Sequence, residues 1–228
     1  MLPIDDVDLQ HIWTYAKSCL PELDSARLFL TGGTGFFGCW LLESLRCAQQ
    51  TFGLKTEIVV LTRNPEMFVQ HQPHLAKMPR INFLLGDVTN FVYPDGEFTH
   101  VIHAATQASA HLNQDHPFSM QDTIVKGTRH VLDFAYTRGV KKFLLTSSGA
   151  VYGTQPADLS HISETYMGAP DPLCATSSYG LAKRLAEHMC ILYAKHMEIK
   201  IARCFAFVGP HLPLKIHFAI GNFMSWQV

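Results

Sequence analysis

The sequence lacks three features: a surplus of basic residues, a long apolar run and a cysteine pair at metal-binding spacing. Its 18 Lys and Arg residues are balanced by 19 Asp and Glu residues, which gives a formal net charge of −1 at pH 7. Basic side chains provide most of the binding to nucleic acids, so we expect no nucleic-acid partner. No stretch approaches the roughly 18 apolar residues that cross a bilayer, so we expect no membrane partner.

The cysteines form no CxxC pair, and the first residues lack the basic and then apolar pattern of a signal peptide. We therefore expect reduced thiols and a cytoplasmic protein. The histidines have neither HExxH spacing nor companion ligands, so we expect no metal site. Ser148 does not lie in the hydrolase motif GxSxG. The cysteines are Cys19, Cys39, Cys47, Cys174, Cys190 and Cys204.

The sequence does contain a regular alternation of short apolar runs and helix-like stretches, and 47% of its residues are hydrophobic. Unbroken apolar runs are typical of parallel strands covered on both faces. The predicted strands are Arg27–Thr31, Glu57–Leu61, Ile81–Leu85, His100–His103, Lys142–Thr146 and Lys200–Phe205. The predicted helices are Asp8–Cys19, Gly35–Ala48, Glu66–Lys77, Pro117–Arg138 and Ser177–His196. The pattern predicts an α/β fold, a doubly wound parallel sheet with helices on both faces and a binding site at the carboxyl ends of its strands.

A glycine-rich stretch, TGGTGFFG, follows the first predicted strand and opens a helix. It matches both GxGxxG and GxxGxxG, in which glycines permit a tight turn and close approach of a pyrophosphate to the helix N-terminus. An ordinary β-turn-α connection has similar composition, but the strand-turn-helix context favours dinucleotide binding in a Rossmann-type fold. The predicted cofactor contacts here are Gly32, Gly33, Thr34, Gly35, Phe36, Phe37 and Gly38.

The second and third predicted strands end in residues suited to the adenosine half of a dinucleotide. No carboxylate follows the second strand, where one would accept the ribose hydroxyls of NAD. Arg63 stands there and favours a 2′-phosphate, hence NADP, although a surface loop arginine is an equally simple interpretation. Asp87 and Val88 follow the third strand, where the carboxylate can accept a hydrogen bond from adenine or cap a turn.

Together, the motifs TGGTGFFG, GDV, HAA, SSGAVYG, YGLAK and RCFAFVGP resemble the extended short-chain dehydrogenase/reductase family, in particular its NAD-dependent epimerase/dehydratase branch acting on nucleotide sugars. The resemblance runs in order from about Arg27 to Asn222. It implies an NAD(P)-dependent enzyme with a nucleotide-sugar substrate. It also implies catalytic roles for Ser148, Tyr179 and Lys183, and cofactor contacts for His103, Ala104, Ala105, Tyr179 and Lys183.

The pair Tyr179 and Lys183 also has chemical support of its own. The two residues lie one helical turn apart on a common face. A free tyrosine has a pKa of about 10, and a nearby ammonium and an oxidised nicotinamide both favour its phenolate. Ser148, at the end of the fifth strand, can polarise a substrate oxygen while Tyr179 moves its proton and the cofactor accepts a hydride.

Four positions depart from the family pattern. Gly149 and Ala150 replace the Asp-Glu pair of the 4,6-dehydratases, which removes the acid and base of elimination, and Ala150 also disfavours decarboxylation. Ile124 and Ala206 replace polar residues near proton or substrate paths. The sequence therefore favours epimerase or ketoreductase chemistry over 4,6-dehydration.

Three segments are predicted along the chain: an N-terminal helical extension at 1–25, the NAD(P)-binding domain at 26–210, and the start of an incomplete substrate domain at 211–228. Because the family continues beyond this point, we expect most of the substrate domain to be missing. The alternative function is a catalytically silent dinucleotide-binding fragment or interaction protein. The resemblance also implies a possible homodimer through helices Pro117–Arg138 and Ser177–His196.

Overall fold

The computed structural model describes residues 2–106 and 115–212. Its sheet consists of six parallel strands in the order β3-β2-β1-β4-β5-β6. The strands are β1 Arg27–Thr31, β2 Glu57–Thr62, β3 Ile81–Leu85, β4 His100–His103, β5 Lys142–Ser148 and β6 Glu198–Cys204. This Rossmann-type order confirms the predicted doubly wound sheet. The order reverses between β1 and β4, which places the binding crevice at their carboxyl ends.

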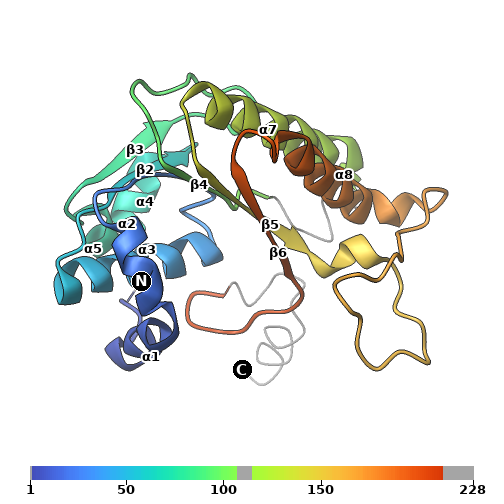
Figure 1. The fold of residues 1–228 in the computed structure, drawn as a ribbon, viewed down its shortest axis with the longest axis horizontal. Coiled ribbons are helices and arrows are strands. Elements are labelled where there is room, and N and C mark those ends of the chain that lie inside the picture. The colour runs from blue at the N-terminus through green and yellow to red at the C-terminus, as the bar shows by residue number, and fades with distance from the viewer. Residues whose placement is uncertain (1, 107–114, 213–228) are drawn as a thin grey trace.

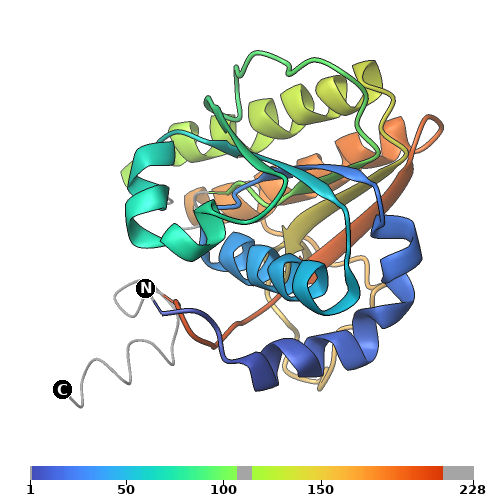
Figure 2. The ribbon, with the colours of Figure 1, turned by 90° about the vertical axis from the view of Figure 1, so that its left-hand side faces the viewer.

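Helices cover both faces of the sheet (Figures 1 and 2). On one face lie α7 Pro117–Thr137 and α8 Ser178–Tyr193, packed on an aromatic-rich core around Phe29, Phe134 and Phe143. On the other face lie α1 Asp6–Ala16 and α3 Phe36–Phe52, with α4 Pro65–His71 and α5 Pro73–Ala76 beside them. Short helical turns complete the described elements: η1 Lys17–Cys19, α2 Leu20–Leu23, η2 Gly149–Tyr152 and η3 Ala175–Ser177.

The strand predictions hold to within two residues at each end, but one predicted helix is interrupted. The stretch expected as a single helix at 66–77 is divided into α4 and α5 at Gln72 and Pro73. Proline has no N–H to donate within a helix and disfavours helical geometry in the residue before it. The φ of −129° at Gln72 shows that interruption directly.

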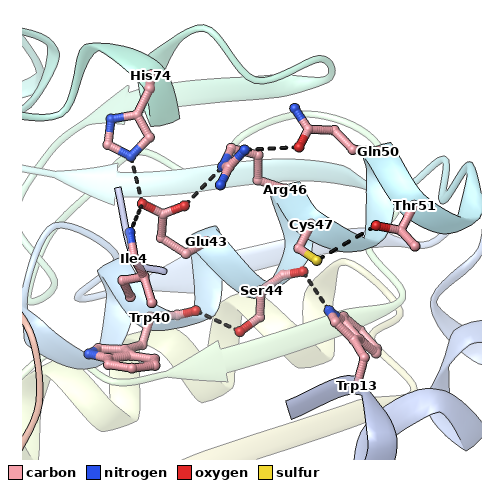
Figure 3. A network of polar contacts seen from close by, with 10 residues as sticks. All are labelled: Ile4, Trp13, Trp40, Glu43, Ser44, Arg46, Cys47, Gln50, Thr51 and His74. Carbon is pink, nitrogen blue, oxygen red and sulfur yellow. Dashed lines mark hydrogen bonds and ion pairs between the residues drawn. The ribbon is translucent and has the colours of Figure 1, made fainter. Parts of the chain in front are cut away.

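The N-terminal segment is packed into the fold through α3 (Figure 3). Glu43 of α3 is 1% exposed, and its carboxylate accepts hydrogen bonds from Ile4 N at 3.3 Å and Arg46 Nε at 2.9 Å. The same carboxylate lies 2.6 Å from His74 Nε2 of α5. Trp13 Nε1 of α1 donates to the carbonyl of Ser44 at 3.0 Å. Ile4 and Trp13 are both buried, so this segment completes the core on its face of the sheet.

Candidate active site

A cleft of about 650 Å³ opens at the carboxyl ends of the strands. It is bounded by the glycine-rich turn, the ends of the strands and the first two turns of α8. Twelve of the residues predicted from sequence line it: Gly32, Thr34, Gly35, Phe36, Phe37, Arg63, Asp87, Val88, Ala104, Ala105, Tyr179 and Lys183. Segments far apart in the chain thus meet at one cavity.

The glycine-rich turn owes its shape to close backbone packing. Gly32 has a φ of +71°, and a Cβ added to it would lie 2.5 Å from the backbone C and O of Ala104. A Cβ on Gly38 would lie 2.3 Å from Gly33 Cα, so Gly33 and Gly38 pack the turn against α3 and do not line the cleft. Gly35 differs, because a Cβ there would meet only Gly32 O, at 3.4 Å. It begins α3 on the open side of the turn.

This geometry fits the pyrophosphate of a dinucleotide. Gly35 is the N-cap of α3, and the first two residues of that helix, Phe36 and Phe37, line the cleft with it. The N–H groups of a first helical turn have no partners within the helix and carry the positive end of its dipole. A phosphate bound next to Gly35 would meet those groups without an intervening side chain.

Asp87 lies beyond β3 with Arg63 as a charged neighbour from the end of β2. Burial raises the pKa of the Asp87 carboxyl, but hydrogen bonds from Thr89 and the charge of Arg63 outweigh it, so the pKa is lowered overall. Thr89 N and Oγ1 donate to one oxygen, Oδ1, at 3.0 and 2.6 Å. Asp87 is therefore an ionised turn-capping residue that also lines the cleft.

His103 has a different place from the one expected for a cofactor contact. Its side chain is 3% exposed and lies behind the cleft lining, between Thr31 Oγ1 at 2.7 Å and Thr128 Oγ1 at 3.1 Å. Burial lowers its pKa to about 3, so the imidazole is neutral. Thr31 Oγ1 also accepts a hydrogen bond from Ala105 N at 3.1 Å. The His103 side chain thus supports the strand end from behind, while Ala104 and Ala105 line the cleft.

Lys183 is 3% exposed and has two partners that the sequence did not single out. Its Nζ donates to Thr106 Oγ1 at 2.6 Å and to the carbonyl of Thr146 at 2.8 Å. Burial lowers the pKa of the lysine to about 8. The only sequence signal for these threonines is their place directly after HAA and directly before the two serines that end β5.

Tyr179 is half-buried and lines the same pocket. Burial raises the pKa of its hydroxyl, a hydrogen bond with Ser148 opposes that shift, and the pKa is raised overall. The groups of the protein alone therefore do not lower the pKa of Tyr179, as was expected from Lys183 together with an oxidised nicotinamide. Ser148 Oγ also accepts a hydrogen bond from Ala150 N at 3.2 Å, which fixes the serine at the start of η2. Ser148 does not itself line the cleft and meets it through Tyr179.

The segment after β6 closes one side of the cleft. Phe207 packs edge-on against Phe37, with ring centroids 4.5 Å apart. Trp40 Nε1 of α3 donates to the carbonyl of Pro210 at 3.1 Å. Phe207 and His211 of this segment join the cleft lining together with Cys204, the last residue of β6, and none of the three was predicted as a site residue. The sequence motif marked this segment but not which of its side chains turn inward.

Comparisons with known proteins agree with this site. Residues 28–225 match the model of the NAD dependent epimerase/dehydratase family. The chain is 31% identical over 205 residues to UDP-glucuronic acid decarboxylase 1 of Arabidopsis thaliana, a match that covers 89% of this chain but only 44% of that protein. The chain thus spans about half the length of the curated relatives it matches.

Solved structures of nucleotide-sugar enzymes share the fold, and two of them are examples. UDP-glucuronic acid 4-epimerase from Bacillus cereus, in complex with UDP-glucuronic acid and NAD, superposes with a TM-score of 0.68 at 22% identity, covering 83% of this chain and 60% of that one. DesIV from Streptomyces venezuelae, a dTDP-glucose 4,6-dehydratase with NAD bound, gives 0.71 at 21% identity, covering 88% and 62%. With the family model matched over most of its length, this chain belongs to the NAD dependent epimerase/dehydratase family.

Proposed function

We propose that this chain binds a nicotinamide dinucleotide and oxidises a hydroxyl group of a nucleotide sugar. The observation that carries the proposal is the meeting of Tyr179 and Lys183 with the glycine-rich turn at one cleft, with Ser148 hydrogen-bonded to Tyr179. The relatives that match most of the chain act on UDP-glucuronic acid by name. A nucleotide sugar is therefore the proposed substrate class.

The proposed chemistry divides between three side chains. Bound in its oxidised form, the dinucleotide would supply a hydride acceptor. Tyr179 would accept the proton of the substrate hydroxyl, and Ser148 would donate a hydrogen bond to that oxygen. Lys183 would hold the ribose hydroxyls and place a positive charge beside the developing phenolate. Because burial raises the pKa of Tyr179, that charge is needed for the tyrosine to act as a base near neutral pH.

The surroundings of Gly149 favour simple hydride chemistry over elimination. A Cβ at Gly149 would lie 2.5 Å from the ring of Phe205, so the position where 4,6-dehydratases carry an acid is occupied by an aromatic side chain. Ala150 likewise offers no acid or base. These two positions support an epimerase, in which the hydride is returned to the same carbon, or a ketoreductase, in which the reduced dinucleotide gives its hydride to a carbonyl carbon.

Decarboxylation is the second candidate, because the relative from Arabidopsis thaliana is named a UDP-glucuronic acid decarboxylase. Oxidation next to the carbon that bears a carboxylate gives a β-keto acid, and this shares its first step with epimerisation. Ala150 argues against decarboxylation, whereas the similarity to this relative argues for it. Product identity with UDP-glucuronic acid decides between them.

For the cofactor, the proposal favours NADP over NAD. Arg63 is exposed just after the end of β2 and lines the cleft next to Asn64. A guanidinium binds phosphate through paired hydrogen bonds, whereas a carboxylate at this place would select the free ribose hydroxyls of NAD.

A homodimer is also proposed, through the outer face of α7 and α8. These helices expose several large apolar side chains: Phe118, Tyr136, Leu185, Ile191 and Leu192. A second copy of the same face would bury them in a four-helix arrangement. Sedimentation analysis with and without Ile191→Glu tests this, because a dimer interface containing a buried charge should dissociate.

The alternative of a silent dinucleotide-binding protein is separated by two successive experiments. Calorimetric titration with NAD and NADP measures binding by the full chain. Turnover is then followed by product NMR with UDP-, dTDP-, GDP- and CDP-sugars, UDP-glucuronic acid included. Tight dinucleotide binding without turnover of any sugar would contradict the proposed enzyme activity of this chain and support the silent alternative.

A further inference from the structure

Helix α8 carries a buried carboxylate in line with the predicted catalytic pair. Tyr179, Lys183 and Glu187 follow one another at intervals of four residues, so they form a row along one side of the helix. Glu187 is 7% exposed, close to the 3% of Lys183. A carboxylate at this depth is retained only where other groups satisfy its charge and its oxygen atoms.

Two side chains, those of Ser147 and Arg203, hold the Glu187 carboxylate in place. Ser147 Oγ at the end of β5 donates to Oε1 at 2.5 Å. Arg203 of β6 donates from Nε to Oε1 at 3.0 Å and from Nη2 to Oε2 at 2.8 Å. The remaining Nη1 of Arg203 donates to the Tyr152 hydroxyl at 2.7 Å. The carboxylate is therefore fixed between α8, β5 and β6 and cannot turn away from the row.

The two thiols near Lys183 are uncharged at neutral pH. Cys204 of β6 and Cys190 of α8 lie near enough to raise the pKa of Lys183, but they would do so only as charged thiolates. Burial raises the pKa of Cys190 to about 12, and it raises the pKa of Cys204 as well. Neither carries a negative charge at pH 7.

The other ionisable groups around the lysine leave Glu187 as the source of negative charge. His103 of β4 is neutral because its pKa is about 3. Arg203 is positive, and its guanidinium is turned to Glu187 and Tyr152. Among the described residues that shift the pKa of Lys183, Glu187 is thus the one that is negatively charged at neutral pH, and it raises that pKa against the effect of burial.

We propose that Glu187 is a positioning residue of the site, whose anchored negative charge stabilises the ammonium group of buried Lys183 one turn earlier on α8. The inference rests on the proposed function only in naming Lys183 as the lysine of the catalytic pair. Without this carboxylate the lysine would lose its proton at lower pH. It would then hold neither a ribose hydroxyl nor the phenolate of Tyr179 by charge.

The test follows the protonation of Lys183 directly in the full chain. Protein labelled with ¹³C-lysine is titrated from about pH 6 to 10 by NMR of the Cε–Hε groups, with Lys183→Arg used to assign the signal. In the wild type the Lys183 signal should titrate with a pKa of about 8. Glu187→Gln keeps the shape and one oxygen to accept from Ser147 Oγ and Arg203 Nε, and it should lower that pKa by about one pH unit.

Two matched variants separate charge from packing. Glu198→Gln removes an equal charge from an exposed position on β6 and should leave Lys183 unchanged. Ser147→Ala breaks a hydrogen bond to Glu187 but keeps its charge, so Lys183 should again be unchanged. An unaltered lysine in Glu187→Gln, or an equal shift in Ser147→Ala, would overturn the proposal.

A folding failure of Glu187→Gln leaves the question decidable with Glu187→Asp, which keeps the charge. The shorter Asp side chain draws the charge back from Ser147 and Arg203, so a changed pKa of Lys183 in Glu187→Asp supports the role, and a pKa equal to the wild-type value contradicts it. These measurements need neither turnover nor bound dinucleotide. Absence of turnover would contradict the proposed function. The role of Glu187 would still be decided by the titration of Lys183.

Discussion

The half of the cleft at the glycine-rich turn after β1 is held by close packing of backbone, whereas the half beside β5, β6 and α8 is held by hydrogen bonds of side chains. At the glycine-rich turn the backbones of Gly32 and Ala104 touch so closely that a single added carbon would collide. Around Lys183, by contrast, hydrogen bonds from side chains fix each group. An added side-chain volume should therefore destabilise the first half, and the loss of one polar atom should impair the second.

The largest expected effect is on the side-chain half. Tyr179→Phe removes one hydroxyl and keeps the ring, so turnover should fall by about 10³-fold while the fold is retained. Rates with the best nucleotide sugar, together with thermal unfolding curves, measure both parts. Full activity of this variant would remove Tyr179 from the mechanism. Tyr193→Phe, at the other end of α8, is the matched control and should keep its activity.

The backbone half should respond most strongly to Gly32→Ala. The left-handed φ of +71° and the 2.5 Å approach of the new Cβ to Ala104 should lower the free energy of unfolding. A loss of about 2–4 kcal/mol is expected in urea denaturation. Gly35→Ala is the internal control, since its Cβ has room: it should fold normally and lose dinucleotide affinity. Equal stability of the two variants would show that the turn tolerates added volume.

Lys183→Met should show how much the buried charge of this lysine lowers the stability of the side-chain half. The pKa of about 8 lies below the ordinary lysine value of 10.5. Between these values the unfolded chain holds more protons, so wild-type stability gains from this residue as the pH rises. Lys183→Met should thus be more stable by about 1–2 kcal/mol at pH 7 after its lost hydrogen bonds are discounted, with the advantage shrinking toward pH 10. An advantage that does not vary with pH would mean that Lys183 carries no buried charge.

The smallest expected effect concerns Arg63, an exposed side chain at the edge of the backbone half. Arg63→Ala should weaken NADP binding by about fivefold and leave NAD binding nearly unchanged, because only NADP has a 2′-phosphate. Calorimetric titration with both dinucleotides measures the ratio. Equal losses for the two would show that Arg63 does not read the phosphate.

The sequence predicted the parts of this fold that depend on local pattern. Unbroken apolar runs located the strands, and the glycines located the turn, because both follow from the residues themselves. The break between α4 and α5 was missed although Pro73 signalled it. The burial of His103 could not be read from HAA, since a histidine at a strand end faces the cleft or the core depending on Thr128, 25 positions away.

The site shows the same limit. The spacing of YGLAK placed Tyr179 and Lys183 on one face, but the partners of Lys183 come from the ends of β4 and β5, which only the folded sheet brings together. The rise in the Tyr179 pKa caused by burial could not be read from the sequence either, because burial depends on the packing of the whole pocket. Ionisation is a property of the assembled site.

The buried carboxylate of Glu43 sets a practical limit on how this protein can be shortened. The match to the family model begins at residue 28, which invites a minimal domain cut just before β1. Such a cut would remove Ile4, whose N–H binds Glu43, together with Leu9 and Trp13 from the core. It would leave a charged group and an apolar face of α3 open to water. The smallest unit for engineering therefore starts ahead of Ile4.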